Sequence, residues 1–142
     1  MILGIDHVGV VTEDAAGVGA FLDALGMTRT EDGTAPDYGV SCDFWQFSPA
    51  PSEPAVEVVA PVAQDAAVHD YLAKNGPGLY HVAFEVDDLD GELTRLRRNG
   101  FIPIDREPCR GARPGMRVAF LYLPKPAAFL VELVHYSARR RG

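Results

Sequence analysis

The sequence is poor in cysteine and lacks long hydrophobic runs. Cys42 and Cys109 are the only cysteines in 142 residues, with neither CxxC spacing nor the density of a secreted disulfide scaffold. No run of about 18 apolar residues is present, and the N-terminus lacks the basic, apolar and small-residue succession of a signal peptide. These absences argue against a disulfide-stapled or membrane-spanning chain, so we expect a soluble cytoplasmic protein.

Basic residues are scarce in residues 1–91, where only Arg29 and Lys74 stand against 16 acids, whereas residues 92–142 hold 11 bases and 4 acids. The net charge of −7 argues against binding to nucleic acid. A basic cluster in the second half either binds a phosphate-bearing ligand or forms an ordinary solvated surface. Its members are Arg106, Arg110, Arg113, Arg117 and Lys125. The arginines at 139–141 are expected to form a frayed tail.

What the sequence does contain is an internal repeat. Residues 5–27 and 79–101 align at an offset of 74, and their identities include His7/His81, Val8/Val82, Asp14/Asp88, Gly17/Gly91 and Gly26/Gly100. The segments VEVV at 56–59 and VELV at 131–134 match at an offset of 75. Each half therefore opens with a His in an apolar run and closes with a Glu in another. Because a repeat defines the structural unit, it decides the predicted fold.

The repeating unit is predicted to be a βαβββ module. In the first half, residues 3–11, 39–47 and 55–60 favour strands, and residues 28–38 favour a loop or short strand. Val18, Phe21, Leu22 and Leu25 form one apolar helix face that ends at Gly26. The second half repeats this order, with a strand around His81, a helix with Leu89, Leu93 and Leu96 facing inward, and strands near 101–105, 116–123 and 129–135.

We therefore predict an α+β fold in which two tandem βαβββ modules form one cupped mixed β-sheet. The chain is expected to be a single domain over 1–142, with module one at about 1–62, a linker helix at 63–78, module two at 79–137 and a tail at 138–142. Each module alone is too short for a generous core, so the two are expected to share one interior.

The repeated His and Glu residues predict a metal site inside this sheet. His81 shares a strand face with Leu79 and Ala83, and Glu132 shares one with Leu130 and Val134, so both are expected to be buried. Taken singly, such a His is usually structural and such a Glu usually faces solvent. Two of each, buried together, are costly without a cation. The predicted ligands are His7, Glu57, His81 and Glu132, a set that suits cobalt, nickel, manganese, zinc or iron.

Paired modules of this kind resemble the vicinal oxygen chelate superfamily over essentially the whole chain. Within it, KNGPGLYHVAFEVDD at 74–88 resembles the methylmalonyl-CoA epimerase family signature around its second-module histidine. IDHVGV at 5–10 resembles the opening strand of that family, and VAFL at 118–121 and LVEL at 130–133 resemble its closing strands. The resemblance implies the same four ligands, and a metal-dependent epimerase or isomerase that abstracts a proton alpha to a carbonyl of an acyl-CoA or related compound.

The sequence departs from that family at three places. Tyr80 stands where members usually have a second His, and the closing hairpin at 121–129 lacks their His-Pro-Lys stretch and paired glycines. The family's second acid/base, on the third strand of module one, aligns among Cys42, Asp43 and Phe44. Of these three, Asp43 exchanges a proton most easily near neutral pH, so Glu132 and Asp43 are the predicted catalytic pair.

The predicted substrate-binding residues are Trp45, Tyr122, Arg113 and Lys125. Two other functions stay open: a glyoxalase-type or natural-product tailoring enzyme acting on another small molecule, and a metal-free antibiotic-sequestering resistance protein. A complete set of four ligands counts against the second. Unpaired edge strands also predict a homodimer.

Overall fold

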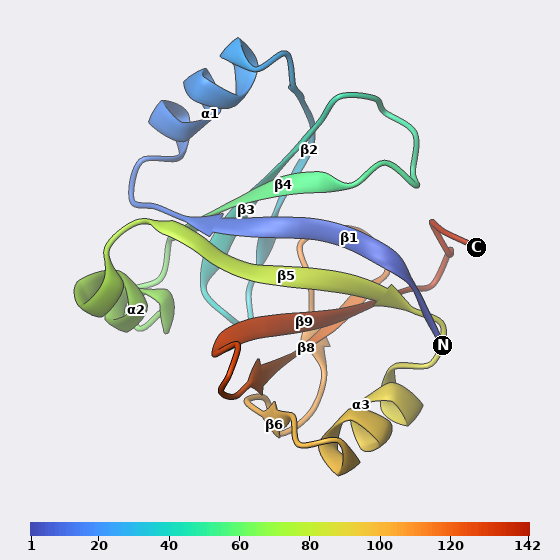
Figure 1. Cartoon of the computed structure of the whole chain (residues 1–142). Coiled ribbons are helices and arrows are strands. Elements are labelled where there is room, and N and C mark those ends of the chain that lie inside the picture. The colour runs from blue at the N-terminus through green and yellow to red at the C-terminus, as the bar shows by residue number, and fades with distance from the viewer.

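The computed structural model describes all 142 residues as one mixed β-sheet with three helices outside it (Figure 1). The first module consists of β1 (Ile2–Val11), α1 (Ala15–Ala24), β2 (Thr28–Ala35), β3 (Val40–Gln46) and β4 (Ala55–Pro61). After α2 (Val68–Asn75), the second consists of β5 (Gly78–Val86), α3 (Leu89–Arg98), β6 (Ile102–Pro103), β7 (Cys109–Arg110), β8 (Met116–Leu123) and β9 (Phe129–Tyr136). The predicted α+β fold with tandem modules is confirmed.

The strand order places the repeated residues at the centre of the sheet. The order is β2-β3-β4-β1-β5-β9-β8-β6, and β7 pairs with β8. The first strands of the two modules, β1 and β5, pair antiparallel, and each also pairs in parallel with the last strand of its own module. The strands that carry the two His and the two Glu are therefore four neighbours, as Figure 1 shows.

The sheet is open, and its two ends meet through side chains and loops. The end strands β2 and β6 do not pair with each other. Tyr38, in the β2–β3 turn, donates a hydrogen bond to Asp105 over 2.8 Å, and Arg110 pairs with Asp37 at 3.1 Å. These contacts join the far ends of the two modules and enclose the inner face of the sheet.

The residues shared by the two halves of the repeat form the ends of α1 and α3. Asp14 accepts a hydrogen bond from the backbone N–H of Gly17 over 2.9 Å, and Asp88 accepts one from Gly91 over 3.1 Å. A side chain at Gly17 would meet the Asp14 carboxylate, because its Cβ would lie 2.4 Å from Oδ2. Much of the repeat signal therefore comes from helix capping.

The apolar face predicted for the first helix is exposed at two of its positions. Phe21 is 78% exposed and Leu25 is 68% exposed, whereas Gly19 and Leu22 are the buried residues of α1. Gly19 brings the helix close to Trp45, since a Cβ there would lie 2.8 Å from the indole ring. The helix therefore contacts the sheet along a narrower strip than its apolar spacing indicates.

Other element boundaries also differ from the prediction. The backbone N–H groups of Val62 and Ala63 both bond to the carbonyl of Gly39, which fixes this segment in a turn, so α2 begins only at Val68. Residues 28–35 form a full strand, and the strand expected at 101–105 shrinks to the two residues of β6. None of the three helices has the length and apolar character needed to cross a bilayer.

The expected frayed tail is also wrong. Arg140 donates its backbone N–H to Glu85 over 2.8 Å, and the Arg141 side chain is only 8% exposed. The last residues lie beside the beginning of the chain (Figure 1). A side chain at Gly4 would contact Arg141.

Candidate metal centre

The structure brings the side chains of His7, Glu57, His81 and Glu132 together, and all four are buried. One N or O atom from each lies within 4.8 Å of all the others. His7 Nε2 lies 3.0 Å from His81 Nε2, 2.8 Å from Glu132 Oε1 and 3.4 Å from Glu57 Oε1. His81 Nε2 lies 3.3 Å from both carboxylates. The four residues come from β1, β4, β5 and β9, one per strand.

These separations fit atoms that share one divalent ion. Metal–ligand bonds of about 2.0–2.2 Å place neighbouring ligand atoms roughly 3–3.5 Å apart. The orientation of His7 agrees, because its Nδ1 faces Asp6 and its Nε2 faces the other ligands, where the lone pair of the neutral ring would bind an ion. Glu132 Oε1 is buried there without a hydrogen bond. Acceptor atoms that face one another out of water require a cation or added protons.

A β-bulge gives His7 its partner Asp6. Cross-strand pairing shifts register between Ile5 and His7, so Asp6 is an extra residue in β1. Asp6 and His7 are consequently both completely buried, although strict strand alternation would place them on opposite faces. Asp6 Oδ2 accepts the Nδ1–H of His7 over 2.7 Å. This bond fixes the imidazole tautomer and ring orientation.

Gly9 makes room for His81. The two residues are cross-strand partners in β1 and β5, and a Cβ at Gly9 would lie 2.1 Å from Cε1 of the imidazole. The other sides of this ring face His7, Tyr80 and Phe120, with ring centroids 5.1 to 5.2 Å away. Only a glycine at position 9 leaves enough space for the imidazole of His81 in its observed position.

Charge balance in the metal-free centre holds protons on the imidazoles and removes the proton from Glu57. Burial opposes the charged form of His7, but Glu57, Glu132 and the bond to Asp6 raise its pKa well above the usual value. Burial likewise opposes protonation of His81, and the same two carboxylates outweigh it and raise its pKa. The pKa of Glu57 is lowered, because the two imidazoles outweigh its desolvation. Without metal, positive charge on the imidazoles thus compensates Glu57.

A mostly apolar cavity opens onto this centre. Glu57, His81 and Glu132 reach its wall, together with side chains such as Val40, Val118 and Phe120. The other proton-carrying groups on this wall are Tyr38, Cys42 and Tyr80. Burial and the nearby glutamates raise the pKa of the Cys42 thiol, and burial, followed by Glu132, raises the pKa of Tyr80 to about 12. Both groups therefore stay protonated near neutral pH.

The prediction that Asp43 faces the site is wrong. On β3 the buried residues Val40, Cys42 and Phe44 face the interior, while Asp43 and Trp45 lie on the opposite face. Asp43 lines a shallow depression beneath α1 with Arg29, whose Nη1 lies 3.9 Å from its carboxylate. Trp45 packs with Leu22, Met27 and Val58 and does not reach the cavity. An alternating strand sends neighbouring residues to opposite faces, so a one-residue error in alignment accounts for the placement of Asp43.

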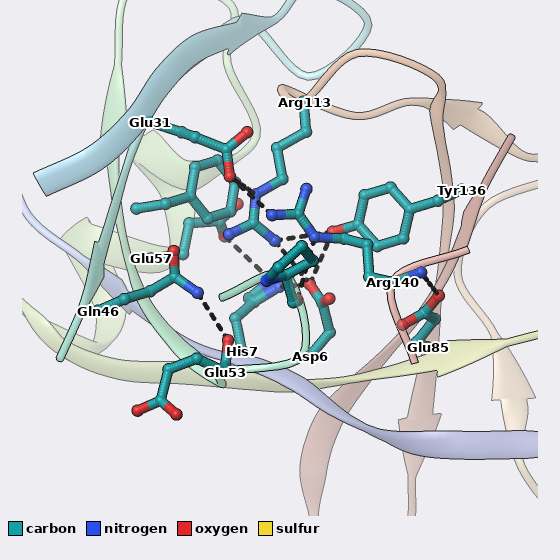
Figure 2. Close-up of polar contacts among 12 residues, drawn as sticks. Asp6, His7, Glu31, Gln46, Glu53, Glu57, Glu85, Arg113, Tyr136 and Arg140 are labelled. Carbon is teal, nitrogen blue, oxygen red and sulfur yellow. Dashed lines mark hydrogen bonds and ion pairs between the residues drawn. The ribbon is translucent and has the colours of Figure 1, made fainter. Parts of the chain in front are cut away.

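The other predicted substrate-binding residues lie away from the cavity wall. Arg113 is buried behind the centre, where its Nη1 donates to Tyr136 over 2.9 Å and to Asp6 over 3.3 Å (Figure 2). Its guanidinium covers the Phe44 ring. Tyr122 lines a separate pocket with Tyr71 and Phe129. Lys125 is exposed in the turn between β8 and β9. Arg113 is thus a structural part of the centre and not part of a ligand-facing surface.

Sequence reasoning missed Asp6, Gly9 and Tyr136 as supports of the centre and gave Arg113 a different role. Asp6 binds His7, Gly9 leaves space for His81, and Figure 2 shows Arg113 and Tyr136 next to Asp6. Asp6 and Gly9 flank His7 in the sequence, so the pattern Asp-His-x-Gly could have drawn attention to them. Nothing local in the sequence connects Arg113 or Tyr136 with His7.

Comparisons with known proteins agree with this geometry. The model of the Glyoxalase/Bleomycin resistance protein/Dioxygenase superfamily matches residues 6–120. The uncharacterized protein YqjC of Bacillus subtilis is 30% identical over 130 residues, which cover 91% of this chain and 89% of YqjC. Mitochondrial methylmalonyl-CoA epimerase of Mus musculus is 29% identical over 131 residues, covering 91% of this chain and 71% of the mouse protein.

Solved structures are also similar to this chain. A methylmalonyl-CoA epimerase in complex with methylmalonyl-CoA and NH4+ superposes with a TM-score of 0.86 at 28% identity, over 100% of both chains. Fold, matched residues and relatives therefore agree, and the chain belongs to the glyoxalase/bleomycin resistance protein/dioxygenase, or vicinal oxygen chelate, superfamily.

Proposed function

We propose that the protein is a metal-dependent epimerase or isomerase that removes a proton alpha to the carbonyl of an acyl-CoA of the methylmalonyl-CoA type. The observation that carries this proposal is the convergence of His7, Glu57, His81 and Glu132 on one point, with all of them except His7 reaching the wall of one apolar cavity. The similarity to methylmalonyl-CoA epimerases over nearly the whole chain supports it.

The four converging residues would hold the ion. A bound divalent cation supplies a Lewis acid that stabilises negative charge on a substrate carbonyl oxygen. Glu132 reaches the cavity wall and is the proposed base that takes the alpha proton. The apolar wall, with Val118 and Phe120, keeps water away from the reacting carbon.

Epimerisation also needs a group that returns a proton to the opposite face of the planar intermediate. Asp43 cannot serve, because it lies on the other side of the sheet. We propose that the donor is one of the protonated side chains of the cavity wall: Tyr38, Cys42 or Tyr80. Tyr38 already donates its hydroxyl proton to Asp105, which leaves Cys42 and Tyr80 as the stronger candidates.

Deuterium exchange tests this assignment. In deuterated water, the wild-type protein loaded with cobalt(II) should exchange the alpha proton of methylmalonyl-CoA and interconvert its two epimers, and Glu132→Gln should abolish both. Loss of the returning donor, in Cys42→Ala or Tyr80→Phe, should stop interconversion while exchange in one epimer persists. Asp43→Asn is the matched control and should behave as wild type. Full activity in a protein shown by elemental analysis to contain no metal would refute the proposal.

The acyl-CoA assignment depends on the cavity rim. Gly111 and Ala112 line the cavity, and the preceding Arg110 is exposed beside Asp37. We propose that Arg110, rather than the buried Arg113, contacts the phosphates of the coenzyme. Arg110→Ala should raise KM for methylmalonyl-CoA and leave KM for methylmalonyl-pantetheine unchanged. Equal KM values for the variant and wild type would favour another small molecule, as for a glyoxalase-type or tailoring enzyme.

We also propose a homodimer. Strand β2 ends the sheet without a partner on its outer side, and Phe21, Leu25 and Phe47 are exposed around the end of α1. Sedimentation should give twice the chain mass, and the double variant Phe21→Ser and Leu25→Ser should reduce it to one chain. A wild-type protein that sediments as a monomer would refute the dimer.

A further inference from the structure

We infer that Arg141, next to the last residue of the chain, is a positioning residue for the metal centre and acts on His7 through Asp6. The inference rests on the proposed metal site and assigns a role in it to a tail that has no contact with the cavity. It is carried by the hydrogen bonds around Asp6, which connect the end of the chain with a candidate ligand 134 residues earlier.

The two oxygens of the Asp6 carboxylate have different partners. Oδ2 accepts bonds from His7 Nδ1 over 2.7 Å and from the Tyr136 hydroxyl over 2.9 Å, and also faces Arg113 Nη1 at 3.3 Å. Oδ1 accepts a bond from Arg141 Nη1 over 2.6 Å and has no other partner. Arg141 therefore holds Asp6 Oδ1 in place and so restricts rotation of the carboxylate plane.

Arg141 is itself held in place. Its Nη1 also donates to Glu85 Oε1 over 3.0 Å, and its Nη2 donates to the carbonyl oxygen of Glu53 over 3.3 Å. The other oxygen of Glu85 accepts the backbone N–H of Arg140, a contact that Figure 2 shows. Asp6 is 0% exposed and Glu85 is 1% exposed, so the guanidinium compensates two buried carboxylates at once.

Removal of Arg141 would leave this arrangement short of a donor. Asp6 Oδ1 would lose its only hydrogen bond, and Glu85 Oε1 would lose its bond to the same guanidinium. The carboxylate would then be free to turn, and the bond that fixes the His7 ring would weaken. Changes to groups that orient a ligating His typically reduce metal affinity by about 10–100-fold.

Cobalt(II) binding to the full-length protein tests the inference. The dissociation constant is measured by competition with a chromophoric chelator, and the visible absorption spectrum of bound cobalt reports ligand geometry. For Arg141→Gln we expect a dissociation constant at least about 10-fold above wild type and an altered spectrum. Arg141→Lys keeps the charge with fewer donors and should lie between the two. Arg139→Gln, at an exposed position in the same tail, is the matched control and should equal wild type.

The possible outcomes separate the inference from the proposed function. If wild type binds no cobalt at the centre, the metal site fails, and the role of Arg141 fails with it. If wild type binds cobalt, and Arg141→Gln loses stability in urea but keeps the wild-type affinity and spectrum, Arg141 is merely structural and the inference is wrong. If Arg141→Gln does not fold, Arg141→Lys decides, because wild-type affinity in that variant together with an unchanged spectrum would overturn the inference.

Discussion

Replacing Gly9 by Ala tests whether the position of His81 is fixed by the space beside it. The added Cβ would lie 2.1 Å from Cε1, 2.5 Å from Nδ1 and 2.6 Å from Nε2 of the imidazole. Nonbonded carbon atoms prefer about 3.5–4.0 Å, so the ring must move by roughly 1.5 Å. His7, Tyr80 and Phe120 occupy its other sides and oppose this movement.

The structure sets the size of the expected effect. Overpacking of this kind costs about 1–3 kcal/mol of unfolding free energy, because neighbouring side chains must leave their preferred rotamers. Metal binding should suffer more than stability, since ligand distances tolerate deviations of only about 0.2 Å. Urea unfolding of the metal-free protein measures the first effect, and cobalt(II) titration with a competing chelator measures the second.

A double-mutant cycle separates the clash from other effects of the substitution. In the His81→Ala background the ring is absent, so Gly9→Ala should cost almost nothing or stabilise the strand by about 0.5–1 kcal/mol, as alanine does relative to glycine. An equal cost in both backgrounds would refute the argument from space. Wild-type cobalt affinity in Gly9→Ala would refute the claim that His81 needs this position.

Three further predictions concern charge. Asp43→Asn should keep the metal content of wild type, measured by elemental analysis, and an unfolding free energy within about 0.5 kcal/mol of wild type, because the substitution changes a side chain outside the centre. Loss of metal in this variant would contradict the placement of Asp43 on the outer face of the sheet. Cobalt affinity should fall as the pH drops below the raised pKa values of His7 and His81, because protons compete with the ion for the imidazoles. Calorimetry in buffers of different ionisation enthalpy should detect the protons that binding releases, and a pH-independent affinity would count against these two ligands. The raised pKa of His7 stabilises the metal-free protein fully below about pH 6.5, the ordinary pKa of histidine, and this stabilisation is lost as the pH rises through the raised pKa. The lowered pKa of Glu57 stabilises the protein fully above about pH 4.5, and this stabilisation is lost on acidification. Urea midpoints should therefore peak between about pH 4.5 and 6.5, and a midpoint that rises steadily above pH 7 would contradict this expectation.

The repeat made the main features predictable from sequence. A single His or Glu in a strand says little, but the same pair at a constant offset predicted both the tandem modules and the four side chains that the structure brings together. The helix ends were readable for a similar reason, since Asp14 and Asp88 cap their helices through local contacts. Signals that are local, and that occur twice, can be read without coordinates.

The errors arose where a single residue of register or a distant partner decides the outcome. Asp43 was preferred over Cys42 because it exchanges protons readily, yet a shift of one residue moves a side chain to the other face of the sheet. Asp6 was missed because a bulge interrupts the alternation of β1. The role of the tail was invisible because Arg141 pairs with Asp6, 135 residues away, and no local pattern encodes that contact.

The order of the four central strands has a consequence for half-length versions of this protein. One module carries one imidazole and one carboxylate of the group, and the other two come from the far side of the β1–β5 seam. If the chain were cut between its halves, each fragment would carry only one imidazole and one carboxylate and would be unable to complete the four-residue metal site. Mixing the two fragments would restore the complete set of ligands.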